Sequence, residues 1–389
     1  MPILKIFFTA LLIGLPCFPS YAFNKTCEQK YCVAVIDAGS TGTRLHIFSY
    51  DLDENNTPIA ITERWAKKIR PGLTSIEPNQ NEINRYLGNL FSGTAARRLP
   101  VYFFSTAGMR LMAKSRQDRI YLYVQEWFKR HSNWQLDSAR TISGSEEGLF
   151  AWLAINYQLG TLTNPKESVG VLDMGGASVQ VAFPVKEASQ INNPENIQEV
   201  DLYGKHFTLF VHSFLGLGLN EVSHQFLESK SCFSTNYELP TGASAEGDSQ
   251  SCESEVSSLI NTVHQVNKVV QPAKTDNPVD HWYVMGALVD LVTSKPFHFD
   301  NNEFSNQELL EKANTDLCHQ DWPALSAQYN DDDYLFGYCL LPSYYYALIV
   351  DGYGISAQQK FNYLPADQNN DWTMGVVLYQ KSLHGGAAS

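Results

Sequence analysis

Two aspartates, Asp37 and Asp173, each begin a glycine-rich segment whose residue types could bind a phosphate chain. The first segment reads Asp-Ala-Gly-Ser-Thr-Gly-Thr-Arg over 37–44, and the second reads Asp-Met-Gly-Gly-Ala-Ser-Val-Gln over 173–180. Glycines let backbone N–H groups approach phosphate oxygens, and hydroxyl side chains add further donors. The carboxylates could carry a hard cation that offsets the phosphate charge. Two such segments could therefore hold one polyphosphate from both sides.

The residues around each aspartate predict the element that positions it. An apolar run leads into each acid, at 33–36 and at 169–172, and β-prone residues follow at 45–48 and 179–183. This pattern predicts two β-hairpins, each with the acid at the end of its first strand. A single Asp-x-Gly hairpin would also fit an ordinary tight turn. The repetition of the whole pattern favours phosphate binding.

The rest of the chain alternates strands and helices in two similar halves, which predicts a duplicated α/β architecture with a cleft between the halves. A buried strand at 101–104 turns into a helix, and Ser143 or Ser145 is a plausible N-cap for a helix that runs to about residue 159. In the second half, we expect strands around 202–211 and 282–287.

The first 22 residues have the pattern of a secretory signal. Lys5 precedes an apolar stretch over 6–15, and Ser-Tyr-Ala at 20–22 has the small-x-small form of a cleavage site. The stretch is shorter than the roughly 20 apolar residues that span a membrane. We therefore expect a secreted or periplasmic protein whose mature chain begins near Phe23. An uncleaved anchor is the alternative.

Cysteine usage agrees with export. Cys17 lies in the predicted signal, and the other six of the seven cysteines form an even number, which predicts disulfides. Their spacings include no CxxC pair and no histidine in zinc-ligand register, which disfavours a metal cluster. The sequence cannot choose among the possible pairings. We take neighbours in the sequence as the hypothesis, and these pairs are Cys27 with Cys32, Cys232 with Cys252, and Cys318 with Cys339.

The net charge of −13 disfavours nucleic acid and anionic membranes as partners, because both require basic patches. A polyanionic substrate must then be met by local groups and a metal ion. No second membrane-spanning segment is evident. The run 334–350 is apolar, but Pro342 and the acids at 331–333 favour a buried element over a span.

Five segments, in this order, resemble those of the ecto-apyrases, or nucleoside triphosphate diphosphohydrolases, of the actin, hexokinase and heat-shock chaperone ATPase superfamily. The last segment keeps a Trp-x-x-Gly spacing but little of its usual surroundings. The segments lie at 35–44, 105–111, 143–148 with Trp152 and 156–157, 172–180, and 371–375.

The resemblance implies two actin/hexokinase-like (ribonuclease H-like) domains with an active-site cleft between them. We place the first at 23–148 plus 363–389 and the second at 149–362. Membrane-bound relatives have a transmembrane helix at one or both ends, whereas this chain is similar to secreted, bacterial-type members. We expect a monomer with no stable membrane anchor.

The resemblance also implies hydrolysis of nucleoside tri- and diphosphates to monophosphates by direct attack of water, without a covalent intermediate. Asp37 and Asp173 are expected to hold Mg²⁺ or Ca²⁺, either directly or through its water ligands. The family's general base falls on Glu147, with Glu146 as the alternative. Adjacent acids at a helix start can also serve only to complement the helix dipole.

Other residues have supporting roles in this interpretation. Ser178 and Gln180 occupy alternate strand positions, so they face one side and could position the attacking water, unless they form a surface polar stripe. Asn156 could support the water network or satisfy local packing. The expected phosphate contacts are Gly39, Ser40, Thr41, Gly42, Thr43, Arg44, Thr106, Arg110, Gly175, Gly176 and Ala177.

Two assignments in this set have structural alternatives. Each of Arg44 and Arg110 could clamp phosphate or form a structural ion pair. Tyr346 and Trp372 are the candidates for stacking on the nucleobase, which would give broad base specificity, although aromatic runs are more often core.

Three rival functions remain. An exopolyphosphatase or guanosine pentaphosphate phosphatase shares the two hairpins but tends to carry an acid where Gln180 stands, and is cytoplasmic. A sugar kinase would need an acceptor-site base, which is not apparent after the first hairpin. A nucleotide-binding protein without catalysis would not need Glu147.

Overall fold

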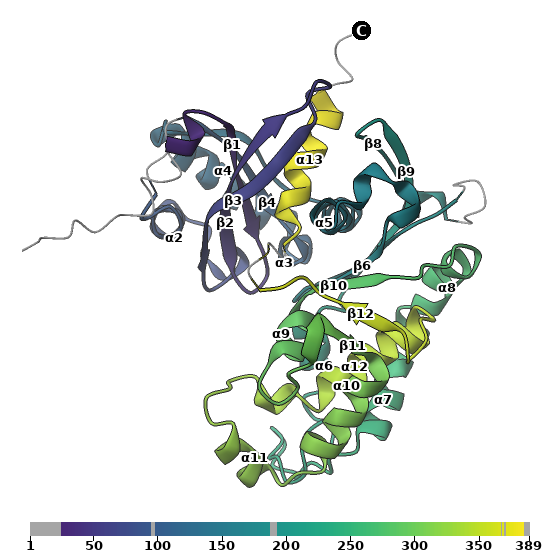
Figure 1. Cartoon of the computed structure of the whole chain (residues 1–389). Helices are drawn as coiled ribbons and strands as arrows, with labels where there is room; N and C mark the ends of the chain where they lie inside the picture. Colours follow the sequence, from purple (N-terminus) through teal and green to yellow (C-terminus); the bar gives the residue numbers. More distant parts are fainter. Residues whose placement is uncertain (1–24, 95–97, 187–192, 367, 369–370, 385–389) are drawn as a thin grey trace, which may run out of the picture.

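The structure is a computed structural model that describes residues 25–384, except 95–97, 187–192, 367 and 369–370 (Figure 1). The predicted signal peptide at 1–22 lies outside the described residues.

The first sheet contains the first predicted hairpin. Its strand order is β3-β2-β1-β4-β5, with β1 and β2 antiparallel and β1 and β4 parallel. Asp37 lies opposite Arg44 at the end of the hairpin, where β1 ends. The strands are β1 (Tyr31–Ala38), β2 (Thr43–Leu52), β3 (Pro58–Ile69), β4 (Leu99–Ser105) and β5 (Trp134–Thr141).

The second sheet repeats this arrangement. In its order, β11-β12-β10-β6-β7-β9-β8, the antiparallel β6–β7 hairpin is flanked by β10, which is parallel to β6, as β4 is parallel to β1. The strands are β6 (Gly170–Met174), β7 (Ser178–Pro184), β8 (Ile197–Leu202), β9 (Lys205–Leu215), β10 (Trp282–Gly286), β11 (Glu303–Ser305) and β12 (Lys360–Asn362).

Two helices, α5 (Gly144–Gln158) and α13 (Thr373–His384), lie between the sheets (Figure 1). Ser143 caps α5, as one of the two predicted candidates, and Glu146 completes a capping box. Residues 147–156 of α5 are all buried because the helix contacts β6, β7, β9 and α13. One apolar cluster includes residues of both sheets and both helices, among them Val35, Leu153, Val171 and Val376.

The remaining helices cover the outer faces. In the first half, α2 (Gln80–Leu90) and α4 (Lys114–Arg130) pack together beside the sheet, and α3 (Ala107–Arg110) follows β4 directly. The second half contains a larger helical layer (Figure 1). Its helices are α6 (Leu219–Gln225), α7 (Ser249–Ser258), α8 (Val266–Asp276), α9 (Ala287–Thr293), α10 (Asn306–Ala313), α11 (Trp322–Gln328) and α12 (Leu340–Tyr346).

Helix α12 and the segment after it, which form most of the apolar run at 334–350, are largely buried in this layer, as predicted. In the part of the chain that the structure describes, we find no helix with the length and apolar character needed to cross a membrane. The three disulfides join the neighbouring cysteines of the hypothesis, which are Cys27–Cys32, Cys232–Cys252 and Cys318–Cys339.

The proposed domain division at 148/149 and 362/363 stays a prediction. β12 is the last strand of the second sheet along the chain, and the chain then returns to the first sheet through α13, which contacts β1 and α5.

Candidate active site

The two glycine-rich loops face each other. A Cβ atom on Gly176 would lie 2.6 Å from Ser40 Oγ and 3.2 Å from Thr41 Cγ2. Side chains of the first loop therefore lie directly against the backbone of the second loop. This contact is the arrangement expected of two loops that share one phosphate chain.

Neighbouring turns hold both loops in place. The backbone N–H of Leu219 donates to the carbonyl of Gly175, and that of Asn220 donates to the carbonyl of Gly176. On the first loop, a Cβ atom on Gly108, in α3, would lie 3.0 Å from Ser40 Cα. Thr106, the N-cap of α3, is buried next to this contact.

The carboxyl groups of Asp37 and Asp173 are buried, and their surroundings disfavour ionisation. Burial raises the pKa of Asp37 to about 7, with a further increase from Asp371 and a decrease from Arg44. Burial also raises the pKa of Asp173 well above its usual value, with further increases from Glu147, Asp371 and Asp37. Several acids in one buried region require a compensating positive charge.

The same two residues fit a hard cation. Asp37 Oδ2 accepts a hydrogen bond from Arg44 Nη1 at 3.3 Å, whereas Asp37 Oδ1 is buried and has no hydrogen-bond partner in the structure. An unpartnered carboxylate oxygen is a suitable ligand for Mg²⁺ or Ca²⁺. Within the described residues, no three His, Cys, Asp or Glu side chains form a metal-binding group by themselves.

Glu147 lies in a cluster built from three elements. Arg110 Nη2, from α3, donates to Glu147 Oε2 at 2.8 Å and to Ser178 Oγ of β7 at 2.9 Å. Arg110 Nη1 also donates to the carbonyl of Ile142 at 3.0 Å. Glu147 itself is only 6% exposed, in the first turn of α5. Burial raises the pKa of Glu147, although Arg110 opposes the increase.

Gln180 joins this cluster, and it lies on the same side of β7 as Ser178, as the alternation predicts. Its Nε2 donates to Ser178 Oγ at 2.7 Å and to Ser213 Oγ at 3.0 Å, and Glu147 Oε2 is 3.3 Å away. Its Oε1 is buried without a hydrogen-bond partner in the structure. The cluster therefore presents a free acceptor oxygen next to a carboxylate.

Glu146, the alternative base, has a different environment. Its carboxylate accepts hydrogen bonds from the backbone N–H of Ser143 and from Arg140 Nη1 and Nη2. These bonds hold the pKa of Glu146 below its usual value, although burial opposes the decrease. The side chain is thus used in the helix cap, and the geometry supports Glu147 as the base.

A second charged cluster includes two residues that sequence reasoning missed, His46 and Asp371. Asp371 Oδ2 lies 3.5 Å from His46 Nε2 and 3.7 Å from Arg44 Nη1. His46 Nδ1 contacts Glu63 on β3. Burial opposes protonation of His46, but Asp371 and Glu63 raise its pKa to about 10. Asp371 directly precedes the Trp-x-x-Gly segment, and this position was the only signal for it in the sequence.

Further positive charge lies beside the first loop. A Cβ atom on Gly42 would lie 3.3 Å from Lys68 Cε and 3.6 Å from Arg70 Cγ. Both side chains come from the end of β3 and its following turn, and both residues are exposed.

Thr43 and Asn156 have hydrogen-bond partners within the fold. The hydroxyl of Thr43 is buried 2.7 Å from Tyr86 Oη, which also lies 2.8 Å from the carbonyl oxygen of Pro71, and the phosphate contact of Thr43 stays a prediction. The side-chain amide of Asn156 bonds the backbone of Val169 and the hydroxyl of Thr161. Asn156 therefore fixes the start of β6 and has the local packing role.

The aromatic assignments have different outcomes. Trp372 is 5% exposed and stacks on Phe150, with ring centroids 6.1 Å apart, so its ring is core and is not accessible for a nucleobase. Tyr346 is half-buried at the end of α12, beside Asp351 and Glu253, and its nucleobase role stays a prediction.

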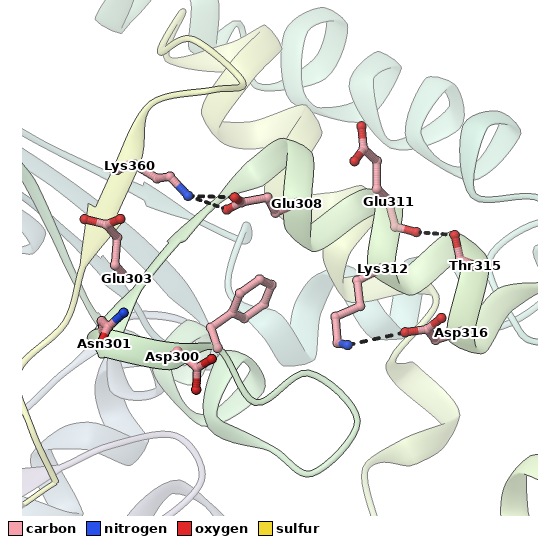
Figure 2. A pocket seen from close by; sticks show the side chains of 10 residues that line it. Asp300, Asn301, Glu303, Glu308, Glu311, Lys312, Thr315, Asp316 and Lys360 are labelled. Carbon is pink, nitrogen blue, oxygen red and sulfur yellow. Dashed lines mark hydrogen bonds and ion pairs between the residues drawn. The ribbon is translucent and has the colours of Figure 1, made fainter.

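A cavity of about 540 Å³ lies elsewhere, over α10 and β11 (Figure 2). Its acidic side chains are partly paired with lysines, as in Lys360–Glu308 and Lys312–Asp316. No residue of the two phosphate loops lines this cavity.

Comparisons with known proteins agree with the motifs. The family model of the GDA1/CD39 (nucleoside phosphatase) family matches residues 23–385. Ectonucleoside triphosphate diphosphohydrolase 1 of Mus musculus is 26% identical, and the alignment covers 90% of this chain and 80% of the relative. Probable apyrase 3 of Arabidopsis thaliana is 28% identical, with 91% and 83% covered.

Among solved structures, nucleoside triphosphate hydrolases from Neospora caninum match with a TM-score of 0.62 and 14% identity, covering 94% of this chain and 95% of that chain. This likeness concerns the fold and confirms the predicted α/β class. Because the family model matches nearly the whole length, this chain belongs to the GDA1/CD39 nucleoside phosphatase family, as its motifs predict.

Proposed function

We propose that this protein hydrolyses nucleoside tri- and diphosphates to monophosphates and phosphate, in one site between its two phosphate loops. The observation that carries the proposal is the cluster of Arg110, Glu147, Ser178 and Gln180, buried next to the facing loops. A protein that only binds nucleotides would not need a buried carboxylate beside a free acceptor oxygen. The relatives named as apyrase and triphosphate diphosphohydrolase support the same substrate class.

The cluster supplies the groups for attack by water. Ser178 and the unpartnered Oε1 of Gln180 hold a water molecule, and Glu147 accepts its proton. The water oxygen forms a bond to the terminal phosphorus as the bond from that phosphorus to the bridging oxygen breaks. The shorter nucleotide leaves with that oxygen, and inorganic phosphate is the second product. The diphosphate product can bind again in the same loops and be cleaved once more.

Other residues bind the phosphate oxygens and balance the charge of the site. Backbone N–H groups of the loops, together with Ser40 and Thr41, bind phosphate oxygens. Arg110 opposes the rise in the pKa of Glu147 that burial causes and holds Glu147 beside Ser178, so its ion pair belongs to the site itself. Asp37 and Asp173 would hold Mg²⁺ or Ca²⁺ together with water and phosphate oxygens, and the cation would neutralise phosphate charge.

The test is phosphate release by the purified full chain from ATP, ADP, AMP and long-chain polyphosphate, with Mg²⁺, Ca²⁺ or EDTA. We expect release from ATP and ADP, none from AMP, and loss of activity with EDTA. Glu147→Gln should lower kcat by about 10²- to 10⁴-fold, the usual contribution of a general base. Glu146→Gln is the matched control at the same helix start and should retain most activity.

Three results would contradict the proposal. Preference for polyphosphate over nucleotides would favour an exopolyphosphatase. No release from any nucleotide would favour a binding protein without catalysis. Wild-type activity in Glu147→Gln would exclude that residue as the base.

We also propose that the protein is exported as a monomer, secreted or periplasmic. The predicted signal and the three disulfides support export. N-terminal sequencing of the mature protein should find a start near Phe23. Intact Met1 on protein recovered from the cytoplasm would contradict export.

A further inference from the structure

Ser213, on β9, lies next to the cluster of Arg110, Glu147, Ser178 and Gln180. No motif marks this serine in the sequence. The register of the second sheet pairs Ser213 with Gln180 of β7. Gln180 Nε2 donates to Ser213 Oγ at 3.0 Å. The function proposed above gives Ser213 no role.

The hydrogen bonds of Gln180 can be counted. An amide nitrogen carries two hydrogens, and three oxygens lie near it. Ser178 Oγ at 2.7 Å and Ser213 Oγ at 3.0 Å are closer than Glu147 Oε2 at 3.3 Å. The two serines therefore take both hydrogens at the shorter distances, and Ser213 takes the one that would otherwise be directed to the proposed base.

The backbone of α5 fixes this arrangement. A Cβ atom on Gly144 would lie 2.2 Å from Ser213 Cβ, and one on Gly148 would lie 3.3 Å from Gln180 Cβ. Glycines thus let the helix that carries Glu147 approach β7 and β9 at backbone distance. Ser213 and the stem of Gln180 are held between the helix and the sheet.

The remaining polar atom of the amide points to a ligand. Gln180 Oε1 is buried and has no hydrogen-bond partner in the structure. Burying an acceptor without a partner is costly, so such atoms in native proteins usually meet water or a ligand. With Nε2 fixed by the two serines, Oε1 is the free acceptor for the attacking water.

We propose that Ser213 is a positioning residue of the catalytic centre. By accepting a hydrogen bond from the Gln180 amide, Ser213 fixes its orientation, so that the amide oxygen binds the attacking water and the amide N–H does not donate to Glu147. This inference rests on the proposed function, because the water is the nucleophile of that reaction.

The first measurement is steady-state hydrolysis of ATP with Mg²⁺ by Ser213→Ala in the full chain. We expect kcat to fall about tenfold, the effect of losing one hydrogen bond in the transition state, while KM stays within about twofold. Thr208→Val is the matched control. It removes a hydroxyl from the same strand, where the hydrogen-bond partner of Thr208 Oγ1 among the described residues is His206, and it should leave both constants unchanged.

The second measurement is a double-mutant cycle, which separates positioning from general structural damage. In a Gln180→Ala background, Ser213→Ala should have little further effect on kcat, because its partner is already absent. The unfolding temperature of Ser213→Ala should stay near that of the wild type.

Three outcomes would overturn the inference while the wild type remains active. They are an unchanged kcat in Ser213→Ala, an equal fold-loss with and without Gln180, and an effect confined to KM. An inactive wild type would instead overturn the proposed function and this inference with it.

Discussion

Arg110 joins the proposed base to Ser178, the residue proposed to hold the attacking water, since one of its nitrogens donates to both Glu147 and Ser178. Sequence reasoning left open whether this arginine binds phosphate or forms an ion pair. The structure shows the ion pair, and it lies inside the site. The pair stabilises the ionised carboxylate, which is the form that can accept a proton.

Removal of this arginine should change the pH dependence of the reaction. Burial already raises the pKa of Glu147, and Arg110 limits that increase. In Arg110→Met the pKa should rise further, so the base becomes protonated at a higher pH. The acid limb of the plot of kcat against pH should therefore move to higher pH. At neutral pH, kcat should fall by at least about tenfold. Steady-state rates measured across the pH range check this.

The control for Arg110→Met is Arg140→Met, which removes an arginine that pairs with Glu146 at the same helix end. Its acid limb should stay where it is in the wild type. If the acid limb of Arg110→Met stayed in place or moved to lower pH, the role assigned to Arg110 would be wrong.

At the scale of single residues, the sequence predicted the groups that lie in motifs and missed those that the sheets bring in. Glu147 and Gln180 occupy short segments with a local pattern. Ser213 is adjacent to Gln180 only because β9 pairs with β7, and His46 meets Asp371 only because the chain returns to the first sheet near its end. Such contacts depend on register and packing, which local residue types do not determine.

Helices α5 and α13 cross in close contact between the two sheets, and this crossing holds the two halves together. A Cβ atom on Gly375 would lie 2.0 Å from the carbonyl oxygen of Phe150, so only glycine permits this approach. Because α5 carries Glu147 in its first turn, the crossing also positions the proposed base relative to both sheets.

Gly375→Ala should therefore destabilise the protein by about 1–3 kcal/mol, the usual cost of overpacking. Gly88→Ala is the control, because Gly88 lies in α2 with open space around its Cα. There alanine should stabilise by roughly 0.5–1 kcal/mol through its better helix propensity. Urea unfolding of both variants measures the difference. Equal stability of the two variants would contradict the proposed close crossing.

The elements themselves were largely predictable. The apolar runs around Asp37 and Asp173 predicted both hairpins, and Ser143 caps α5 as expected. Aromatic residues were harder to interpret, because a buried ring and a ligand-binding ring look alike in sequence. Trp372 belongs to the core. Only the stacking of its ring on Phe150, seen in the structure, reveals this.

On the scale of the whole molecule, a partly buried chain of charges links segments far apart in the sequence. It runs from Glu63 on β3 through His46 on β2 to Asp371, which also lies near Arg44 and thus near Asp37. Asp371 belongs to the segment by which the chain returns from the second sheet to the first. The charges therefore stabilise the attachment of this returning segment to the first sheet, and they also stabilise the first phosphate loop.

The contacts of His46 with Asp371 and Glu63 predict how the stability of the fold depends on pH. The folded pKa of His46 is about 10, raised by Asp371 and Glu63 against the effect of burial, from an unfolded value of 6.5. A raised pKa gives stability that is fully present below the unfolded pKa and is lost as the pH rises through the folded pKa. Between about pH 7 and pH 10, the wild type should lose more unfolding free energy than His46→Gln, which cannot titrate at this position.

Urea unfolding at the two pH values measures both losses. His206→Gln is the control, because His206 is an exposed histidine whose ring contacts Asp201 at the surface, and it should behave as the wild type does. Tyrosines and lysines also titrate in this range, but they are common to all three proteins, so the difference between them isolates His46. If His46→Gln and the wild type lost the same stability, the charged chain would not couple protonation to the joining of the two halves.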